Sequence, residues 1–172
     1  TGVILLAAPL VRAGVVELES LIADCKSGVS GAGRTPNLTT HFCEANEGFK
    51  PYKVAEHRHT PEIEQELSII AGKPIKVVFT PHLVPMSRGI LTTLYANLSK
   101  SVTDEEIRGL YQGAYGRSPF VRVLQPGQLP STLYVRGTNY CDMGWRLEGR
   151  TGRIIAISAI DNLTRGASGQ AI

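Results

Sequence analysis

The densest group of residues that could carry out acid–base chemistry is the segment Glu56–Glu64, which reads EHRHTPEIE. Histidine donates and accepts protons near neutral pH. The segment runs into an expected helix, and the positive end of a helix dipole lowers the pKa of a histidine and attracts anions. His57 could therefore exchange protons beside an anion held by Arg58. A polar helix start without a catalytic role is the competing interpretation.

A metal site is a second possibility for the same segment. His57, His59 and Glu62 provide a His-x-His pair with a carboxylate, which is a possible ligand set for a transition metal. The spacing is a weak signal, so we expect no metal here.

Two further segments could bind anions. The segment Ser27–Arg34 reads SGVSGAGR, and the successive N–H groups of a glycine-rich loop can form a concave anion site beside an arginine fork. It matches neither the phosphate loop that ends in Gly-Lys-Ser/Thr nor a dinucleotide fingerprint, so taken alone it favours a tight loop. The segment Thr80–Gly89 places Arg88 in a proline-stiffened turn, where it could contact a carboxylate or phosphate. A strand edge interrupted by proline is the alternative.

The chain has three cysteines, Cys25, Cys43 and Cys141, and no Cys-x-x-Cys pair. This odd number argues against a disulfide framework or a zinc ribbon and fits a reducing cytoplasm. We expect each cysteine to be a small buried residue. No histidine or basic residue beside Cys141 would lower its pKa, so a nucleophilic role is unsupported.

Capping signals and periodicity predict the helices that position these segments. The predicted helices are 1–14, 39–46, 60–71 and 103–115, and a further one begins within 161–172. Thr60 is expected to cap a helix that has Pro61 at its first position and ends at Gly72. Thr103 is expected to cap another, with acidic residues in its first turn.

Strands outnumber these helices. The predicted strands are 19–26, 75–84, 90–98, 121–124, 133–137, 141–147 and 153–160, and 52–55 is expected to be extended. Turns at 85–89 and 148–152 predict two antiparallel hairpins. The result is an α+β fold with a mostly antiparallel sheet and helices on one face. The first hairpin has apolar residues on both faces, so we expect a second copy of the chain to cover the face without helices.

Composition excludes two classes of partner. The net charge is only +3 and the basic residues are scattered, so we expect no nucleic acid. The longest apolar run, Val3–Leu10, is interrupted by Pro9 and is shorter than the ~20 residues that span a bilayer, so we expect no membrane. A length of 172 residues suffices for a single domain.

Five segments resemble N-acetyl-gamma-glutamyl-phosphate reductases, enzymes of arginine biosynthesis. They are SGVSGAGR (27–34), HRHTPEIEQ (57–65), FTPHLVPMSRGI (79–90), VRGTNYCDMGW (135–145) and DNLTRGASGQA (161–171). They occur in the family's order and extend along the chain almost end to end, so chance does not account for them.

The resemblance implies that residues 1–172 are the substrate-binding and dimerisation half of such an enzyme. The implied fold is that of the catalytic domains of glyceraldehyde-3-phosphate and aspartate-semialdehyde dehydrogenases. A Rossmann domain that binds NADP would lie outside the chain, with residues 1–14 and 162–172 at the junctions. The family nucleophile lies in the segment Asn-Pro-Gly-Cys-Tyr-Pro-Thr, and Thr1 resembles its last residue. We therefore expect the catalytic cysteine just before Thr1, and an isolated chain without activity.

The implied reaction reduces N-acetylglutamyl phosphate to the semialdehyde and phosphate. The cysteine displaces phosphate to form a thioester, which hydride from NADPH reduces. The resemblance makes His57 the acid/base residue, with His59 as the nearby alternative. The implied substrate contacts are Arg58, His59, Glu62, Arg88, Ser30 and Gly31, and the implied cofactor contacts are Gly28, Ser30, Asn162 and Gly169.

Two other interpretations stay open. One is a non-catalytic dimerisation or interaction module, in which the motifs serve only fold and assembly. The other is a small metallohydrolase that uses the two histidines.

Overall fold

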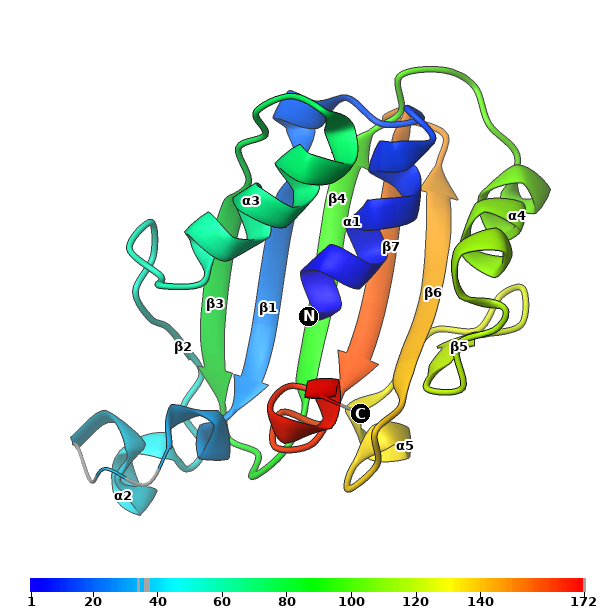
Figure 1. Ribbon diagram of the computed structural model, residues 1–172. Coiled ribbons are helices and arrows are strands. Elements are labelled where there is room, and N and C mark those ends of the chain that lie inside the picture. The colour runs from blue at the N-terminus through cyan, green and yellow to red at the C-terminus, as the bar shows by residue number, and fades with distance from the viewer. Residues whose placement is uncertain (34, 36–37, 172) are drawn as a thin grey trace.

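A computed structural model describes residues 1–33, 35 and 38–171, apart from the side chains of residues 39, 170 and 171. These residues form a seven-stranded sheet in the order β2-β3-β1-β4-β7-β6-β5, with helices packed on it (Figure 1). The strands are β1 (Ile22–Gly28), β2 (Lys50–Pro51), β3 (Val78–Val84), β4 (Ile90–Asn97), β5 (Val121–Val123), β6 (Cys141–Glu148) and β7 (Arg153–Ile160). The helices are α1 (Gly2–Arg12), α2 (Phe42–Ala45), α3 (Thr60–Ala71), α4 (Asp104–Tyr115) and α5 (Thr132–Val135), with 3₁₀ turns η1 (Leu18–Ser20), η2 (Val29–Ala32), η3 (Leu38–Thr40) and η4 (Ser168–Ala171).

The sheet is mixed but mostly antiparallel, as predicted. Strand β1 pairs with β3, and β5 with β6, in parallel, while the other four described pairs are antiparallel. The predicted hairpin between β6 and β7 is confirmed. Helices α1, α3 and α4 lie on the same face (Figure 1), so the predicted α+β fold class is confirmed.

The predicted hairpin between β3 and β4 is wrong, because β1 lies between these two strands. The turn at 85–89 crosses the end of β1 instead of closing on itself. Gly28 N donates to Gly89 O at 2.8 Å and Val29 N donates to Met86 O at 3.0 Å. Two strand spacings are only about 10 Å, a span that five residues easily cross, so turn chemistry alone does not decide whether the flanking strands pair.

The core lies between the sheet and α1. Helix α1 approaches the sheet closely because Gly2 has no side chain, and a Cβ atom there would lie 2.9 Å from Thr92 Oγ1. Leu6 and Leu10 of this helix are fully buried. Helix α4 joins through Tyr111, whose hydroxyl donates to Leu6 O at 2.8 Å. Aligned apolar stripes of helix and sheet therefore seal this face.

The helix boundaries follow the predicted caps closely. The Thr103 side chain accepts from Glu106 N and the Glu106 side chain accepts from Thr103 N, which is a complete capping box for α4. Helix α3 ends at Gly72 in the left-handed conformation, φ 69°. It begins one residue earlier than predicted, with His59 rather than Thr60 at the cap position.

Other local predictions need correction. The predicted strand 133–137 is helix α5, capped by the Ser131 hydroxyl, which accepts from Leu133 N. Residues 52–55 form a turn, because Lys53 and Ala55 adopt positive φ angles of 46° and 61°. The short helix expected at 39–46 is confirmed in part, as α2 after the 3₁₀ turn η3. The described residues after 160 contain turns and the 3₁₀ turn η4 rather than an α-helix, and the strand expected at 19–26 begins at residue 22.

The face of the sheet away from the helices carries both apolar and polar side chains. We call it the open sheet face; register and side-chain alternation place on it the apolar residues Ile22, Val78, Leu91, Tyr95, Ile155 and Ile157, together with Asp24, Lys26, Thr80 and Thr93. Val78 is 60% exposed and Ile22 37% exposed. At one edge the Phe49 ring stacks on His82. At the other, Arg146 donates to Gly127 O, and a loop covers part of β6.

Among the described residues, no helix is long and apolar enough to cross a membrane.

Helix α3 provides a matched test of the core. Leu67 is fully buried, whereas Ile69, two residues along, is 68% exposed. We expect Leu67→Ala to lower the free energy of unfolding by about 2–5 kcal/mol, because it leaves a cavity. Ile69→Ala should change it by less than about 0.5 kcal/mol. Urea denaturation followed by circular dichroism measures both, and equal losses would contradict this assignment of the core.

Candidate functional site

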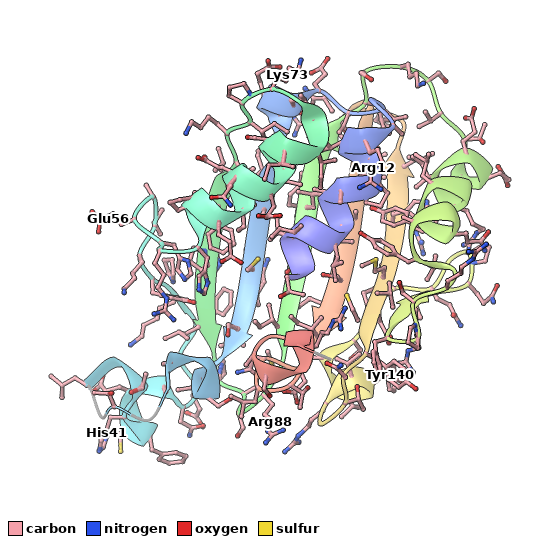
Figure 2. The ribbon with its side chains drawn as sticks, viewed as in Figure 1. Arg12, His41, Glu56, Lys73, Arg88 and Tyr140 are labelled. Carbon is pink, nitrogen blue, oxygen red and sulfur yellow. The ribbon has the colours of Figure 1, made fainter. Side chains whose placement is uncertain are left out.

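The motif segments meet at one end of the sheet. Strands β1 and β3 are parallel, and β7 runs in the same direction because both β1 and β7 are antiparallel to β4. The carboxyl ends of all three therefore lie together, beside the amino end of α1 (Figure 1). Arg88 lies at this end of the molecule and Lys73 at the opposite end (Figure 2).

Hydrogen bonds tie the segments that follow these strands into one unit. Asn162, just after β7, accepts from Gly89 N at 2.7 Å and donates to Ser30 Oγ at 2.9 Å. Ser30 Oγ in turn donates to Ser87 O. Side chains and backbone from three distant parts of the sequence thus hold one another in place.

The glycine-rich loop is packed against the neighbouring turn. The N–H groups of Gly28, Val29 and Ser30 all donate to carbonyl oxygens of residues 86–89, so these three donors do not point at an anion. A Cβ atom at Gly28 would lie 2.9 Å from Met86 O, and one at Gly31 would lie 3.2 Å from Asn162 Nδ2. The glycines therefore serve close packing. Arg34, the predicted anion fork of this loop, lies outside the described residues.

A buried carboxylate organises the turn after β7. Asp161 is fully buried and accepts hydrogen bonds from the N–H groups of Gly137 (2.7 Å), Leu163 (2.8 Å) and Thr164 (3.1 Å). Arg88 Nη1 lies 3.5 Å from its carboxylate. Burial alone would raise the pKa of Asp161, but the three backbone donors and the charge of Arg88 outweigh it and hold the pKa below its usual value.

Further contacts hold the end of the described chain against the sheet. Asn139 Nδ2 donates to Gly169 O at 2.9 Å, and the Thr164 hydroxyl donates to Thr138 O. Gly169 N donates to Thr164 O at 2.8 Å. Gly169 is itself buried.

His57 lies in an aromatic cluster just before α3. Its ring makes edge contacts with the rings of Phe79 (5.1 Å between centroids), Tyr52 (5.5 Å) and His59 (5.1 Å). Burial lowers the pKa of His57, and the nearby His59, Lys53 and Arg58 lower it further. The ring is therefore neutral at neutral pH.

Helix α1 lies between these two regions. It packs against α3, and at its amino end Gly2 O accepts from the Ser158 hydroxyl of β7 at 3.5 Å. The candidate site lies around this end of α1 (Figure 1).

The predicted site residues thus fall into two groups. The loop and turn group contains Gly28, Ser30, Gly31, Arg88, Asn162 and Gly169. The group around α3 contains His57, Arg58, His59 and Glu62. Among the described residues, no set of three His, Cys, Asp or Glu side chains is placed to hold a metal ion.

The cysteines divide into two buried and one exposed. Burial raises the pKa of the Cys25 thiol to about 11 and that of the Cys141 thiol to about 12, so neither is a reactive thiolate at neutral pH. Cys43 is exposed, and the prediction that it is buried is wrong because α2 is a short surface helix.

Sequence reasoning missed Asp161, Arg165 and Tyr52. An acidic residue directly after an apolar strand is a signal that could have identified Asp161 as a turn-forming residue. The burial of the Arg165 Nε atom and the contact between Tyr52 and His57 depend on tertiary packing and leave no signal in the local sequence.

Comparison with known proteins agrees with this architecture. Residues 1–162 match the family model described as semialdehyde dehydrogenase, dimerisation domain. Aspartate semialdehyde dehydrogenase II from Vibrio cholerae superposes with a TM-score of 0.74 at 15% identity, covering 99% of this chain and 57% of that one. The enzyme from Francisella tularensis gives 0.70 at 16% identity, covering 97% and 59%. These likenesses show the fold.

Curated relatives are more similar in sequence. The chain is 63% identical over 172 residues to N-acetyl-gamma-glutamyl-phosphate reductase of Syntrophobacter fumaroxidans and 56% identical over 173 residues to that of Pelobacter propionicus. Each alignment covers 100% of this chain and 50% of the relative, so the chain spans about half the length of these proteins. The predicted resemblance is confirmed, and the chain belongs to the semialdehyde dehydrogenase dimerisation-domain family.

Proposed function

We propose that this chain is the substrate-binding and dimerisation half of an N-acetyl-gamma-glutamyl-phosphate reductase. The observation that carries the proposal is 63% identity to one such reductase over the whole length of the chain. The whole enzyme would reduce N-acetylglutamyl phosphate to the semialdehyde and release phosphate.

The proposed nucleophile is a cysteine that precedes Thr1 in the longer protein. Its thiolate attacks the acyl carbon and phosphate leaves, which gives a thioester. NADPH, when bound, supplies the hydride that reduces this thioester. The residues of this chain bind the substrate and manage its protons.

His57 is the proposed acid/base residue. His59 N donates to His57 Nδ1 at 3.3 Å, and this contact assigns the proton of the neutral ring to Nε2. Because burial keeps the ring neutral, Nε2–H is available to donate to a substrate oxygen as negative charge develops there. His59 is the alternative, and its backbone already orients His57.

The remaining proposed substrate contacts surround this histidine. Arg58 and Glu62 are exposed on the same helix start, where an arginine fork can bind a carboxylate. Arg88, Ser30 and Gly31 are held in the loop and turn group. They would line the site from the other side of Thr1.

NADP is the proposed cofactor of the whole enzyme, bound chiefly by a nucleotide-binding domain outside residues 1–172. Asn162 uses both atoms of its amide on Gly89 and Ser30, and Gly169 O accepts from Asn139. Gly28 N is also paired within the chain. These residues therefore fit a supporting role at the cofactor-facing edge, beside the proposed junctions at 1–14 and 162–172.

Self-association is the second part of the proposal. The open sheet face presents exposed apolar side chains, Val78 and Ile22 among them, which suits a second copy packed sheet to sheet. A non-catalytic dimerisation module is the alternative function for the chain, and the same face supports it.

We also propose a cytoplasmic location. The cysteines at 25, 43 and 141 are all free thiols, and free thiols are usual in a reducing compartment.

The direct test of the proposed function uses the full-length protein that contains this chain. We expect it to reduce NADP when N-acetylglutamate semialdehyde and phosphate are both supplied, as followed by absorbance. The isolated 172-residue chain should not do so. A full-length protein without this activity would favour the non-catalytic module, and metal-dependent hydrolysis would favour a metallohydrolase.

In the full-length enzyme, His57→Ala should lower kcat by about 100- to 10,000-fold, the usual contribution of a positioned acid/base group. His59→Ala should cost less, because the backbone N–H that contacts His57 remains. Arg58→Ala should act mainly on KM, since an anion anchor binds ground and transition states alike. Steady-state kinetics decides, and the reverse ranking of the histidines would transfer the catalytic role to His59.

The lowered pKa of His57 gives a second prediction. Lys53→Gln removes a positive charge that lowers this pKa, so the pKa of His57 should rise. Lys73→Gln, at the opposite end of the molecule (Figure 2), should leave it unchanged. A titration of the His57 ring by NMR measures both, and a fall in the Lys53 variant would contradict the electrostatic account.

The open sheet face predicts the assembly. Light scattering should give about twice the 18.6 kDa mass of one chain, with an interface of at least ~1,200 Å². Ile157→Asp places a charge on this face and should yield a monomer, whereas Ile69→Asp on the exposed side of α3 should not. A wild-type monomer at micromolar concentration would rule out the proposed interface.

A further inference from the structure

Two buried hydroxyl groups lie side by side on the helix-covered face of the sheet. Thr92 of β4 and Ser158 of β7 are each only 1% exposed and are partners in the register of these strands. The rows on either side of this pair, on the same face, are apolar: Leu94 with Ala156, and Ile90 with Ile160. Burying a hydroxyl group in apolar surroundings is unfavourable unless it has good partners, so this pair requires an explanation.

Hydrogen bonding alone does not provide it. Thr92 Oγ1 lies 3.3 Å from the Sγ atom of Cys25, its partner in β1. Ser158 Oγ lies 3.5 Å from Gly2 O, which is long for a hydrogen bond. Among the described residues, neither hydroxyl makes a further hydrogen bond. An alanine or valine at either position would therefore give up little bonding.

Close packing against Gly2 explains the pair better. A Cβ atom at Gly2 would lie 2.9 Å from Thr92 Oγ1 and 3.0 Å from Ser158 Oγ, closer than such atoms can pack. A hydroxyl oxygen is also smaller than the methyl group that valine would place there. The glycine and the two hydroxyls together let the amino end of α1 lie directly on β4 and β7, as Figure 1 shows for β4.

We propose that Thr92 and Ser158 are positioning residues for the nucleophile. This inference rests on the proposed function, in which the nucleophilic cysteine stands just before Thr1. The position of its thiol then depends on where the amino end of α1 lies, and the two hydroxyls fix that end through Gly2. A misplacement of roughly 1 Å, caused by a change away from the reacting atoms, can lower a rate by about a hundredfold.

The sheet gives the nucleophile and the proposed acid/base residue a common support. The His57 ring packs on Phe79 of β3, while Gly2 packs on Thr92 of β4 and Ser158 of β7. Hydrogen bonds through β1 connect β3 with β4. An acid/base group acts only within hydrogen-bond reach of the reacting atoms. The height of α1 above the sheet therefore decides whether the thiol and His57 meet the same carbon centre.

The test uses the full-length enzyme. Gly2→Ala places a Cβ atom against both hydroxyls and should lower kcat by about ten- to a hundredfold, while the KM values for the semialdehyde and phosphate change by less than about threefold. Adding Thr92→Ala and Ser158→Ala to Gly2→Ala removes both oxygens and should restore at least about threefold of kcat, a non-additive effect.

Gly109→Ala is the control, because a Cβ atom at Gly109 in α4 would meet nothing within 4 Å. It should leave kcat unchanged. Urea denaturation of each variant separates positioning from stability. A general loss of stability cannot account for recovery in the triple variant, since that variant has lost more packing than Gly2→Ala alone.

Two results in an active enzyme overturn the proposal. One is a Gly2→Ala variant with the kcat of the wild type, and the other is a triple variant no faster than Gly2→Ala. A wild-type enzyme without activity contradicts the proposed function instead. In that case the alkylation rate of the cysteine before Thr1 by iodoacetamide decides, as measured by peptide mass spectrometry. The rate depends on the surroundings of the thiol, so Gly2→Ala should change it by at least about threefold, and an unchanged rate overturns the positioning role.

Discussion

The buried carboxylate of Asp161 is the interaction on which the candidate site depends. A fully desolvated charge costs several kcal/mol unless hydrogen bonds and an opposite charge compensate it. Here three backbone N–H groups and Arg88 do so. Because two of these donors belong to its own turn and one to Gly137, the carboxylate fixes the path of the chain after β7. That path places Asn162 against Gly89 and Ser30.

Because Asp161 fixes the chain after β7 in this way, polar residues of the motifs form hydrogen bonds mainly with one another. Ser30, Gly31 and Asn162 hold one another in place. His57 is oriented by the backbone of His59 and by the rings of Phe79 and Tyr52. A site held in this way has little to reorganise on binding, which is the condition under which fixed dipoles and charges act most strongly.

The sequence predicted the individual helices and strands better than it predicted which strands lie next to each other in the sheet. The capping box at Thr103 and the hairpin between β6 and β7 are local, and both were confirmed. The insertion of β1 between β3 and β4 was missed because it depends on pairing between distant segments. Likewise, the five motifs identified the family, and the site residues that they indicate stay predictions. The burial of Asp161 arises only when three strand ends come together.

The position of β1 in the sheet also governs how the chain can fold. Strands β6 and β7 are adjacent in sequence and can pair after a short loop closes, whereas β1 must find partners in β3 and β4 from far along the chain. Closing long loops before their contacts form slows folding. We therefore expect a chain that acquires its β6–β7 half early and its β3–β1–β4 half late. Until β1 pairs with β4, the backbone N–H and C=O groups on that edge of β4 are open to other chains. We therefore expect misassembly to begin at β4, the central strand of the sheet.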